Sequence, residues 1–449
     1  MVLGAGCALD TLLTRPDGGS VGRTSRLACT TSEGTVRTIG QHAGAVAALL
    51  APVIARLTPG TSDPTCLEAR GTADLAAGAG AGARRRLATR IVAPVPLPAF
   101  DNSQMDGFAV RAADAGSDVA VTDPIPAGTV PEPLVPGTAA PIMTGARIPD
   151  GADAVFPVER TEPGTFPAAL ALATVAVPAD LTAGSFVRTV GSDVPFGGVL
   201  ADAGALVTPA LLGAFAAAGV DRVDVVRRPR VLVVSTGSEL VGVDADGAGI
   251  GDANGIALSA ALAEVGVESR TVVVPDDPDA FVDAVTAAVG DWADLVLTTG
   301  GISAGAYEVV RQALEPLGLA VTPVAMQPGG PQALGTVAFG DRQVPVVAFP
   351  GNPVSALVSF EVFLRPVLAP LAGLPADRPS QVLPAAEAAT SPAGKHQVRR
   401  GRVEDGRVHL VGGPGSHLLV HHAAATHLVH VPVGTAVVEP GDPLTVWSL

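Results

Sequence analysis

Short stretches rich in serine, threonine, glycine and asparagine follow apolar segments at several places in the second half of the chain. Hydroxyl groups and glycine N–H groups at the start of a helix form sites for phosphate and other oxyanions. One such stretch is ordinary turn chemistry, but four strand-end loops in order, including the acidic loop at 275–278, favour a phosphate-binding site. The candidate anion-binding residues are Ser235, Thr236, Gly237, Thr299, Gly300, Gly301, Ser303, Pro350, Gly351, Asn352 and Ser355.

Three carboxylates accompany these stretches: Glu239, Asp276 and Glu308. Carboxylate oxygens are the hard ligands that Mg2+ prefers, and Mg2+ often accompanies bound phosphate. Together with the glycine and hydroxyl stretches, these acids predict a site for a phosphoanhydride and a magnesium ion.

A second candidate lies upstream, in residues 101–106. Asp101 and Asp106 flank amide and hydroxyl side chains, so carboxylate, amide and hydroxyl groups all fall within six residues. Such a cluster could take part in catalysis, or it could be a turn whose Asx side chains end a strand. The residue types favour neither interpretation over the other.

The candidate anion-binding residues need a scaffold, and the pattern from residue 230 onward predicts one. Strands are expected at 231–234, 271–274, 295–297 and 344–349, with helical segments between and after them. Strands that are apolar throughout are buried on both faces, and their alternation with helices predicts a parallel, doubly wound sheet. Ligands of such sheets bind at the carboxyl ends of the strands, where the candidates stand.

The remaining segments follow other patterns, so we expect an α/β plus β protein of several domains. An amphipathic helix is expected from Ile39 to Leu57, and the Gly/Ala-rich residues 71–83 are expected to form a flexible connection. The expected domains are a disordered extension (1–37), a discontinuous helical and linking domain (38–93 with 182–226), a β-rich domain (94–181), the doubly wound α/β domain (227–372) and a C-terminal small β-barrel (373–449).

Composition narrows the class of partner. The net charge of −15 argues against a general nucleic-acid or membrane-surface binder, and 3% aromatic residues argue against base stacking. No apolar run is expected to reach the length of a membrane span, and the three cysteines are expected to be free thiols in a cytoplasmic protein. Five of the eight histidines fall between His417 and His430, and we expect them to face solvent rather than bind a metal.

The motifs in order resemble the molybdopterin molybdenumtransferase family, which is MoeA in bacteria and the C-terminal domain of gephyrin. The resemblance covers roughly residues 38 to 449. Its two most specific stretches are DNSQMDG (101–107) and PGNPVSA (350–356). The others are PIMTGARIPDGADAVFPVE (141–159), VRTVGSDV (187–194), RPRVLVVSTGSELV (228–241), VVPDDP (273–278), TTGGISAGAYE (298–308), MQPGGP (326–331) and FPGNPVSALVSFEVFLRP (349–366).

The resemblance implies an activity and an assembly. Adenylylated molybdopterin and molybdate would be the substrates, molybdenum would be placed on the dithiolene sulfurs, and AMP would be released with Mg2+ assisting. It implies a homodimer in which Asp106 and Thr144 reach a cleft that contains the other subunit's doubly wound domain. Asp193, Glu239, Asp276 and Glu308 would lie near Mg2+ and the phosphates. The molybdopterin adenylyltransferase and the recipient molybdoenzymes are implied partners.

The chain departs from the family where cations are expected. The family commonly has lysines around a PGKP motif, whereas this chain has Pro323, Gln327 and Gly330. Because the substrate is strongly anionic, loss of cations removes electrostatic stabilisation. Two hypotheses follow: an active enzyme that uses Mg2+, Arg147, Arg188 or Arg399 instead, and a catalytically weak paralogue that binds molybdopterin or scaffolds cofactor delivery.

Overall fold

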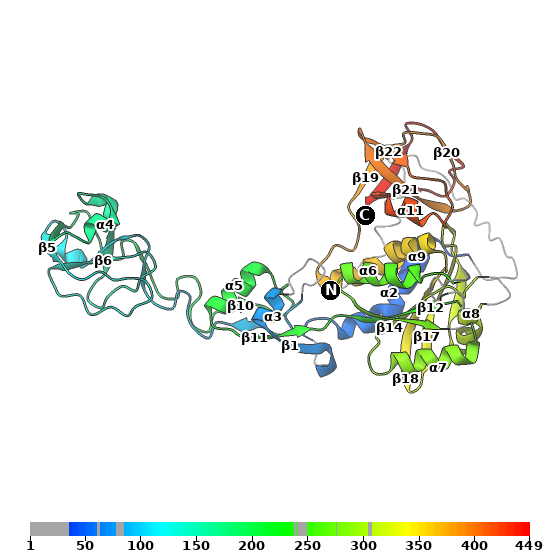
Figure 1. Ribbon diagram of the computed structural model, residues 1–449, viewed down its shortest axis with the longest axis horizontal. Helices are drawn as coiled ribbons and strands as arrows, with labels where there is room; N and C mark the ends of the chain where they lie inside the picture. Colours follow the sequence, from blue (N-terminus) through cyan, green and yellow to red (C-terminus); the bar gives the residue numbers. More distant parts are fainter. Residues whose placement is uncertain are drawn as a thin grey trace, which may run out of the picture. The chain divides into compact units, whose positions relative to one another are not determined.

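The computed structural model describes residues 36–60, 63–77, 85–237, 240, 249–274, 276–303 and 308–449 (Figure 1). These residues form two compact units. The first unit contains residues 36–67 and 226–449, and the second contains residues 68–77 and 86–225. The extension expected at 1–37 lies almost entirely outside the described residues.

The first unit is built around a six-stranded sheet with the order β13-β12-β14-β18-β17-β15. Strands β13, β12, β14 and β18 are parallel, and β17 is antiparallel to both of its neighbours. Their bounds are β12 (Arg230–Thr236), β13 (Glu268–Val274), β14 (Leu295–Thr299), β15 (Ala320–Pro323), β17 (Pro331–Phe339) and β18 (Arg342–Phe349).

Helices cover both faces of this sheet because alternate side chains of each strand are apolar on both sides. Val231 and Val233 face one core together with α2 (Ile39–Arg56), α6 (Ala253–Glu264) and α9 (Pro353–Ser359). Leu232 and Val234 face a second core with α7 (Pro278–Val289) and α8 (Val309–Leu314). Figure 1 shows α6 and α9 on one side of the strands and α7 on the other. A short helix, α10 (Arg365–Leu368), continues beyond α9.

Helix α2 lies in a different unit from the one in which the sequence pattern placed it. Its start matches the sequence pattern, because Thr38 and Gln41 form a reciprocal capping box. Its buried residues Val46 and Leu50, however, pack in the same core as β12. The helix therefore belongs to the first unit and not with residues 182–226, since that core offers the apolar surface that its buried stripe requires.

Two helical stretches, Ile39–Arg56 and Pro353–Ala372, are long and apolar enough to cross a membrane by length and composition alone. This corrects the expectation that no apolar run reaches that length. Within the stretch 353–372, 72% of the residues tested are buried in the protein, against 28% in α2. Both stretches contribute side chains to the same core of the first unit.

The first unit also contains the C-terminal sheet, with the order β16-β21-β23-β25-β19 and β22 paired to β21. A short pair, β20 with β24, completes it. The bounds are β16 (Met326–Gln327), β19 (Ser380–Pro384), β20 (Ala389–Thr390), β21 (His396–Glu404), β22 (Arg407–Leu410), β23 (His427–Val431), β24 (Val437–Val438) and β25 (Pro443–Ser448).

The histidines of this C-terminal region do not all face solvent. His430 is only 6% exposed, and its Nδ1 lies 3.0 Å from Nε2 of His396, which is equally buried. The expectation was wrong here because β23 is a central strand, so alternate side chains point into the core. His421 and His422 lie on a short helix, α11 (Leu419–Ala423).

The second unit has a five-stranded sheet with the order β7-β4-β6-β5-β8. Phe108 and Phe156 stack within its core at 5.4 Å between ring centroids. A separate, smaller core surrounds Phe215 and Val225. The bounds are β1 (Leu67–Gly71), β2 (Ile91–Val92), β3 (Asn102–Ser103), β4 (Gly107–Val110), β5 (Asp118–Val121), β6 (Thr138–Ile142), β7 (Ala154–Pro157), α4 (Phe166–Ala169), β8 (Thr174–Ala176), β9 (Val187–Arg188), β10 (Val199–Ala201), α5 (Pro209–Ala217) and β11 (Arg222–Val226).

The Gly/Ala-rich stretch was expected to be a flexible connection throughout, but its first part is helical. Residues Thr72–Ala77 form α3, and Thr72 N donates to Asp221 O at 2.9 Å. Leu75 packs against the core around Phe215. Alanine has the highest helix propensity of all residues, and this packing supplies the tertiary support that so short a helix needs.

Candidate functional site

The carboxyl ends of three parallel strands lie at one edge of the first unit's sheet. In the strand register Ser235 pairs with Thr299, and Thr299 pairs with Phe349. Ser235 is 1% exposed and Thr299 is 2% exposed. The strands therefore bring the predicted residues at 235–237, 299–301 and 350–352 to the same edge, as the sequence pattern implies for a doubly wound sheet.

The loops after β14 and β18 meet backbone to backbone. Gly300 and Gly301 have φ of 90° and 65°, in the region that favours glycine. A Cβ added at Gly351 would lie 3.0 Å from the Cα of Gly300, so neither loop has room for a side chain at this contact. The glycines thus let the backbones of the two loops approach closely, and Gly300 N donates to Phe349 O at 3.1 Å. Glycine-rich backbone of this kind can form an oxyanion site.

Two residues of α6, absent from the predicted set, hold these strand ends. Asp252 caps the helix through Gly255 N at 2.8 Å, and the same oxygen accepts from Ser235 Oγ at 2.9 Å. Asn254 Nδ2 donates to Thr299 Oγ1 at 2.9 Å and to Gly351 O at 2.7 Å. An aspartate three residues before the first buried helical residue is an N-cap signal, which could have identified Asp252. No sequence signal points to Asn254.

The hydroxyls of Ser235 and Thr299 at the strand ends have protein partners. Ser235 Oγ donates to Asp252, and Thr299 Oγ1 accepts from Asn254 and donates to Pro350 O at 3.3 Å. Ser355 is only 4% exposed, on the first turn of α9. These side chains therefore shape the loops, and the groups best suited to an anion are backbone N–H groups.

The predicted carboxylates are only partly described. Glu308 Oε2 accepts from Ser303 N at 2.9 Å and thus joins the two ends of residues 304–307. Asp276 is exposed, two residues beyond the end of β13. Glu239 lies outside the described residues, and Asp193 is an exposed residue of the second unit. Within the described part of the chain, no group of three or more His, Cys, Asp or Glu side chains is placed to hold a metal ion.

The second unit brings Asp106 and Thr144 together, although they are far apart in sequence. Asp106 Oδ1 accepts from Thr144 N at 2.6 Å and from Thr144 Oγ1 at 2.8 Å. Strand β4 begins at Gly107, where a Cβ would lie 2.1 Å from Phe156 O. The signature at 101–107 is therefore a tightly packed turn that also carries a carboxylate–hydroxyl pair, and its part in catalysis stays a prediction.

Comparison with known protein families matches three consecutive parts of the chain. Residues 46–219 match the MoeA N-terminal region (domain I and II), 232–370 a probable molybdopterin binding domain, and 382–449 the MoeA C-terminal region (domain IV). Molybdopterin molybdenumtransferase 2 of Mycobacterium tuberculosis is 42% identical over 379 residues, 80% of this chain and 91% of that protein. The chain belongs to the MoeA family.

Other members of the MoeA family are also similar to this chain, in sequence and in fold. Molybdopterin molybdenumtransferase 1 of Mycobacterium tuberculosis is 35% identical over 403 residues, 81% of this chain and 91% of that protein. The crystal structure of the molybdopterin biosynthesis MoeA protein of Pyrococcus horikoshii matches with a TM-score of 0.71 at 26% identity, covering 92% of this chain and 99% of that one. The expected multidomain architecture with mixed α/β sheets is confirmed.

The position where the MoeA family commonly has lysine is occupied by an amide pair. Gln327 Oε1 accepts from Gln397 Nε2 at 2.7 Å, across the β16–β21 contact. Gln332 is fully buried beneath the same loop and donates to Gly329 O and Ser359 Oγ. Neutral amides thus hold this loop through hydrogen bonds instead of presenting charge.

The arginines considered as substitutes for those lysines have different surroundings. Arg147 lies over the ring of Phe100 at 5.8 Å, and Arg188 is exposed on β9. Arg399 is 8% exposed, and its guanidinium donates to Gly412 O at 3.2 Å. Burial lowers the pKa of Arg399 from its usual value.

Proposed function

We propose that this chain transfers molybdenum from molybdate to adenylylated molybdopterin and releases AMP. Membership of the MoeA family and the name shared by its relatives support this activity. The observation that carries the proposal is that the carboxyl ends of β12, β14 and β18 lie at one edge of the sheet. Two glycine loops touch there through their backbones. Such an edge suits the phosphoanhydride of a nucleotide-linked substrate.

The chain's own residues would contribute mainly placement. The N–H groups of Gly237, Gly301, Gly351 and Asn352 would donate to phosphate oxygens. The hydrogen bonds of Gly300 N and of the Ser235 and Thr299 hydroxyls keep those loops in place. Fixed donors around the anhydride lower the barrier because they need no reorganisation during the reaction. Asp106 and Thr144, in the second unit, would act at the strand ends of another subunit.

Mg2+ is part of the proposal, with Asp276 and Glu239 as its nearest protein ligands and Asp193 as a further carboxylate. Mg2+ usually takes only one or two carboxylates and completes its shell with water and substrate phosphates. A single exposed carboxylate beyond β13 fits that requirement without a dedicated protein cage. When bound, Mg2+ would neutralise charge on the phosphates.

The alternative is a catalytically weak paralogue that binds molybdopterin or scaffolds cofactor delivery. The observation that favours it is the hydrogen bond between Gln327 and Gln397, which puts a neutral pair where the family commonly has a cation. The paired Asp106 and Thr144 favour activity instead. We therefore place the active enzyme first.

One assay separates the two. The purified protein is incubated with adenylylated molybdopterin, molybdate and Mg2+, and AMP and active cofactor are measured. Release of AMP coupled to molybdate supports the enzyme. Tight binding of the pterin nucleotide without AMP release would contradict it and support the paralogue.

Asp276→Ala tests the assignment of this carboxylate. We expect a loss of Mg2+-dependent turnover with an unchanged melting temperature, because Asp276 is exposed and lies outside the cores. Asp279→Ala, an exposed acid in the first turn of α7, is the matched control. Equal turnover in Asp276→Ala and the wild type would show that the assignment is wrong.

The proposal extends to assembly and location. We propose a cytoplasmic homodimer that receives its substrate from a molybdopterin adenylyltransferase and serves molybdoenzymes, with no nucleic-acid or membrane partner. The domain division proposed from the sequence is retained except for α2.

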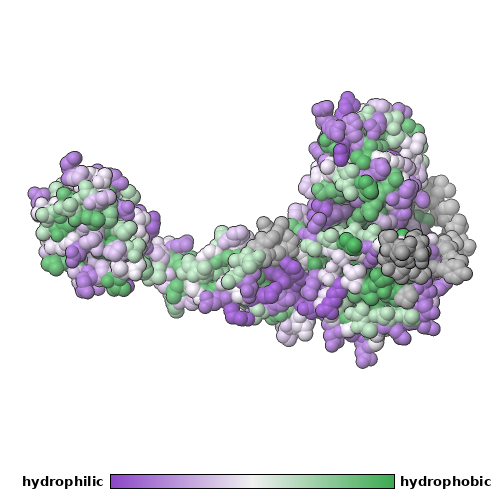
Figure 2. All heavy atoms as spheres, in the orientation of Figure 1, coloured by the Kyte–Doolittle hydropathy of each residue, from purple (hydrophilic) through white to green (hydrophobic). Residues whose placement is uncertain are grey.

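Exposed apolar side chains support an interface: Phe196 is 76% exposed, and Val92 and Val199 are paired and nearly half exposed. Figure 2 shows other hydrophobic residues interspersed with polar ones on the visible face.

A further inference from the structure

The first turn of α6 touches the ends of three strands through two side chains. Asp252 accepts from Ser235, at the end of β12. Asn254 donates one N–H to Thr299, at the end of β14, and the other to Gly351, just after β18. Asn254 therefore uses both hydrogens of its amide to bridge the two glycine loops that meet at this edge.

We propose that Asn254 is a positioning residue of the strand-end site, which holds the loops after β14 and β18 at the spacing that the substrate requires. The inference rests on the proposed function for its kinetic consequence. Its structural basis is independent of that function, because the bridge consists of hydrogen bonds within the chain.

The chemistry of the bridge requires an amide. Gly351 O can only accept a hydrogen bond, so the group that faces it must be a donor. This fixes the orientation of the Asn254 amide, with Nδ2 toward the loops. Its Oδ1 is buried and has no partner among the described residues. An aspartate at this position has the same shape but would place a carboxylate oxygen 2.7 Å from the carbonyl of Gly351, where repulsion would push the loops apart.

The bridge adds to a single backbone hydrogen bond at this point, which Gly300 N donates to Phe349 O at 3.1 Å. Beyond it, Gly300 and Gly351 contact through backbone only, so no side chains of these two glycines set the distance between the loops. Thr299 relays the bridge, since its hydroxyl accepts from Asn254 and donates to Pro350 O at 3.3 Å. A shift of about an ångström in groups that place a substrate can cost on the order of a hundredfold in rate.

The test compares Asn254→Ala, Asn254→Asp and the control Ser259→Ala. Ser259 lies farther along α6 and its hydroxyl is 3.1 Å from that of Thr271, away from the strand ends. We expect kcat for AMP release to fall about 10- to 100-fold in Asn254→Ala, and further in Asn254→Asp, with KM for the pterin nucleotide changed less than kcat. Ser259→Ala should stay within twofold of the wild type.

A second measurement does not depend on the activity. Amide hydrogen exchange of the peptides containing 299–303 and 350–352 should rise at least severalfold in both Asn254 variants without substrate, and not in Ser259→Ala. Unchanged exchange in folded Asn254→Ala would overturn the inference, as would wild-type kcat in that variant. Increased exchange combined with no AMP release by the wild type would refute the proposed function while leaving the bridge supported.

Discussion

At the scale of single residues, Asp106 acts together with a neighbour that the sequence places far away. The carboxylate receives both the backbone N–H and the hydroxyl of Thr144. These bonds connect the turn at 101–107 with the turn at 143–146, and they leave Oδ2 of Asp106 as the oxygen without a Thr144 contact. The adjacent Gly107 has no room for a side chain. One short signature thus combines a chemical group with the packing that orients it.

Thr144→Val removes the hydroxyl and keeps the backbone N–H and the side-chain shape. We expect about a tenfold loss of kcat with the fold retained, because Asp106 keeps only one of its two hydrogen bonds and becomes less well oriented. AMP release and thermal melting are measured side by side. Thr144→Ser is the control and should retain most of the activity; an equal loss in both variants would mean that the hydroxyl is not the relevant group.

At the scale of elements, β21 and β23 bury two histidines side by side. Burial lowers the pKa of His396 to about 4. Burial, and to a smaller extent the neighbouring His396, lowers the pKa of His430 well below its usual value. The ring of His430 also packs on Trp447 at 4.0 Å. Both rings are therefore neutral members of the core.

The histidine pair predicts a loss of stability in acid. In the unfolded chain these imidazoles take up protons as the pH falls below about 6.5, whereas the folded His396 does so only near pH 4. The unfolded state therefore binds more protons between these values, and the free energy of unfolding should fall from pH 6.5 to 4, by about 2–3 kcal/mol for His396. His430 should change it in the same direction.

Urea unfolding at several pH values measures this slope. His430→Leu should make the pH dependence shallower, while His409→Gln, an exposed histidine of β22, should leave it unchanged. An identical slope in His430→Leu and the wild type would contradict the assignment.

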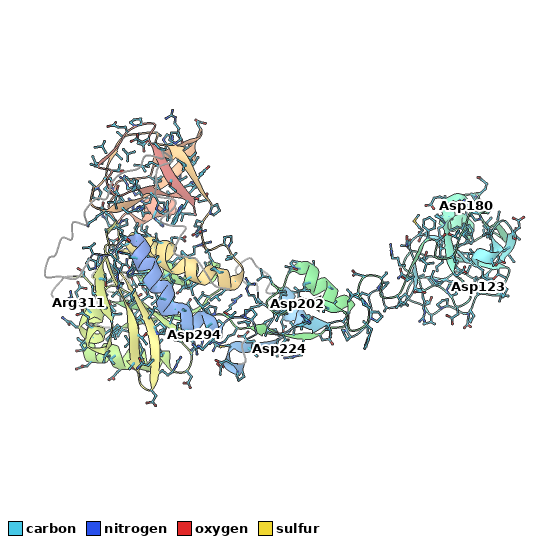
Figure 3. The ribbon with its side chains drawn as sticks, turned by 180° about the vertical axis from the view of Figure 1, so that it is seen from behind. Asp123, Asp180, Asp202, Asp224, Asp294 and Arg311 are labelled. Carbon is cyan, nitrogen blue, oxygen red and sulfur yellow. The ribbon has the colours of Figure 1, made fainter. Side chains whose placement is uncertain are left out.

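A buried ion pair joins elements near the boundary of the first unit. Arg227 forms two hydrogen bonds with Asp294, at 2.7 and 2.8 Å, and both side chains are less than a tenth exposed. Asp294 also accepts from Arg56 at the end of α2 and from Arg230 N (Figure 3). Arg227 in turn donates to Thr65 O. These bonds tie α2, β12 and the segments before β1 and after β11 to the start of β14.

Asp294→Asn leaves the guanidinium of Arg227 buried without its counter-charge. We expect the free energy of unfolding of the first unit to fall by about 3–5 kcal/mol, because an uncompensated buried charge is costly. Arg56→Gln should have a much smaller effect, since its side chain is 45% exposed and solvent screens its charge. Calorimetric melting compares the two variants, and similar small shifts in both would show that the pair contributes little.

At the scale of the whole molecule, the proposed homodimer depends on surfaces that the second unit leaves uncovered. Phe196 is the most exposed large hydrophobic side chain of the segment that contains β9 and β10. A phenylalanine that is 76% exposed beside a half-exposed valine pair is costly in water unless another surface covers it. The observation supports an interface that includes β2 and β10.

Phe196→Glu introduces a charge into that patch. If the patch lies in the dimer interface, the variant should dissociate at concentrations where the wild type is dimeric, as measured by light scattering after size exclusion. Val130→Glu, at another exposed apolar residue of the second unit, is the control. The interface assignment fails if Phe196→Glu remains dimeric.

The sequence by itself determined the local features of this protein. Apolar runs such as Val231–Val234 predicted the strands, and the polar residues that follow them predicted which edge of the sheet carries the site, because strand direction and strand ends are local properties. Motifs such as 101–107 identified the family. The tertiary structure decided which distant groups meet. Asn254 and Gly351, Asp106 and Thr144, Arg227 and Asp294, and His396 and His430 are hydrogen-bonded pairs separated by tens of residues.

No periodicity encodes such pairs, since each depends on how elements pack after they form. The same holds for α2, whose amphipathic pattern specified a helix but not the core that receives it. The helix packs in the first unit, where its apolar stripe covers part of one face of the sheet.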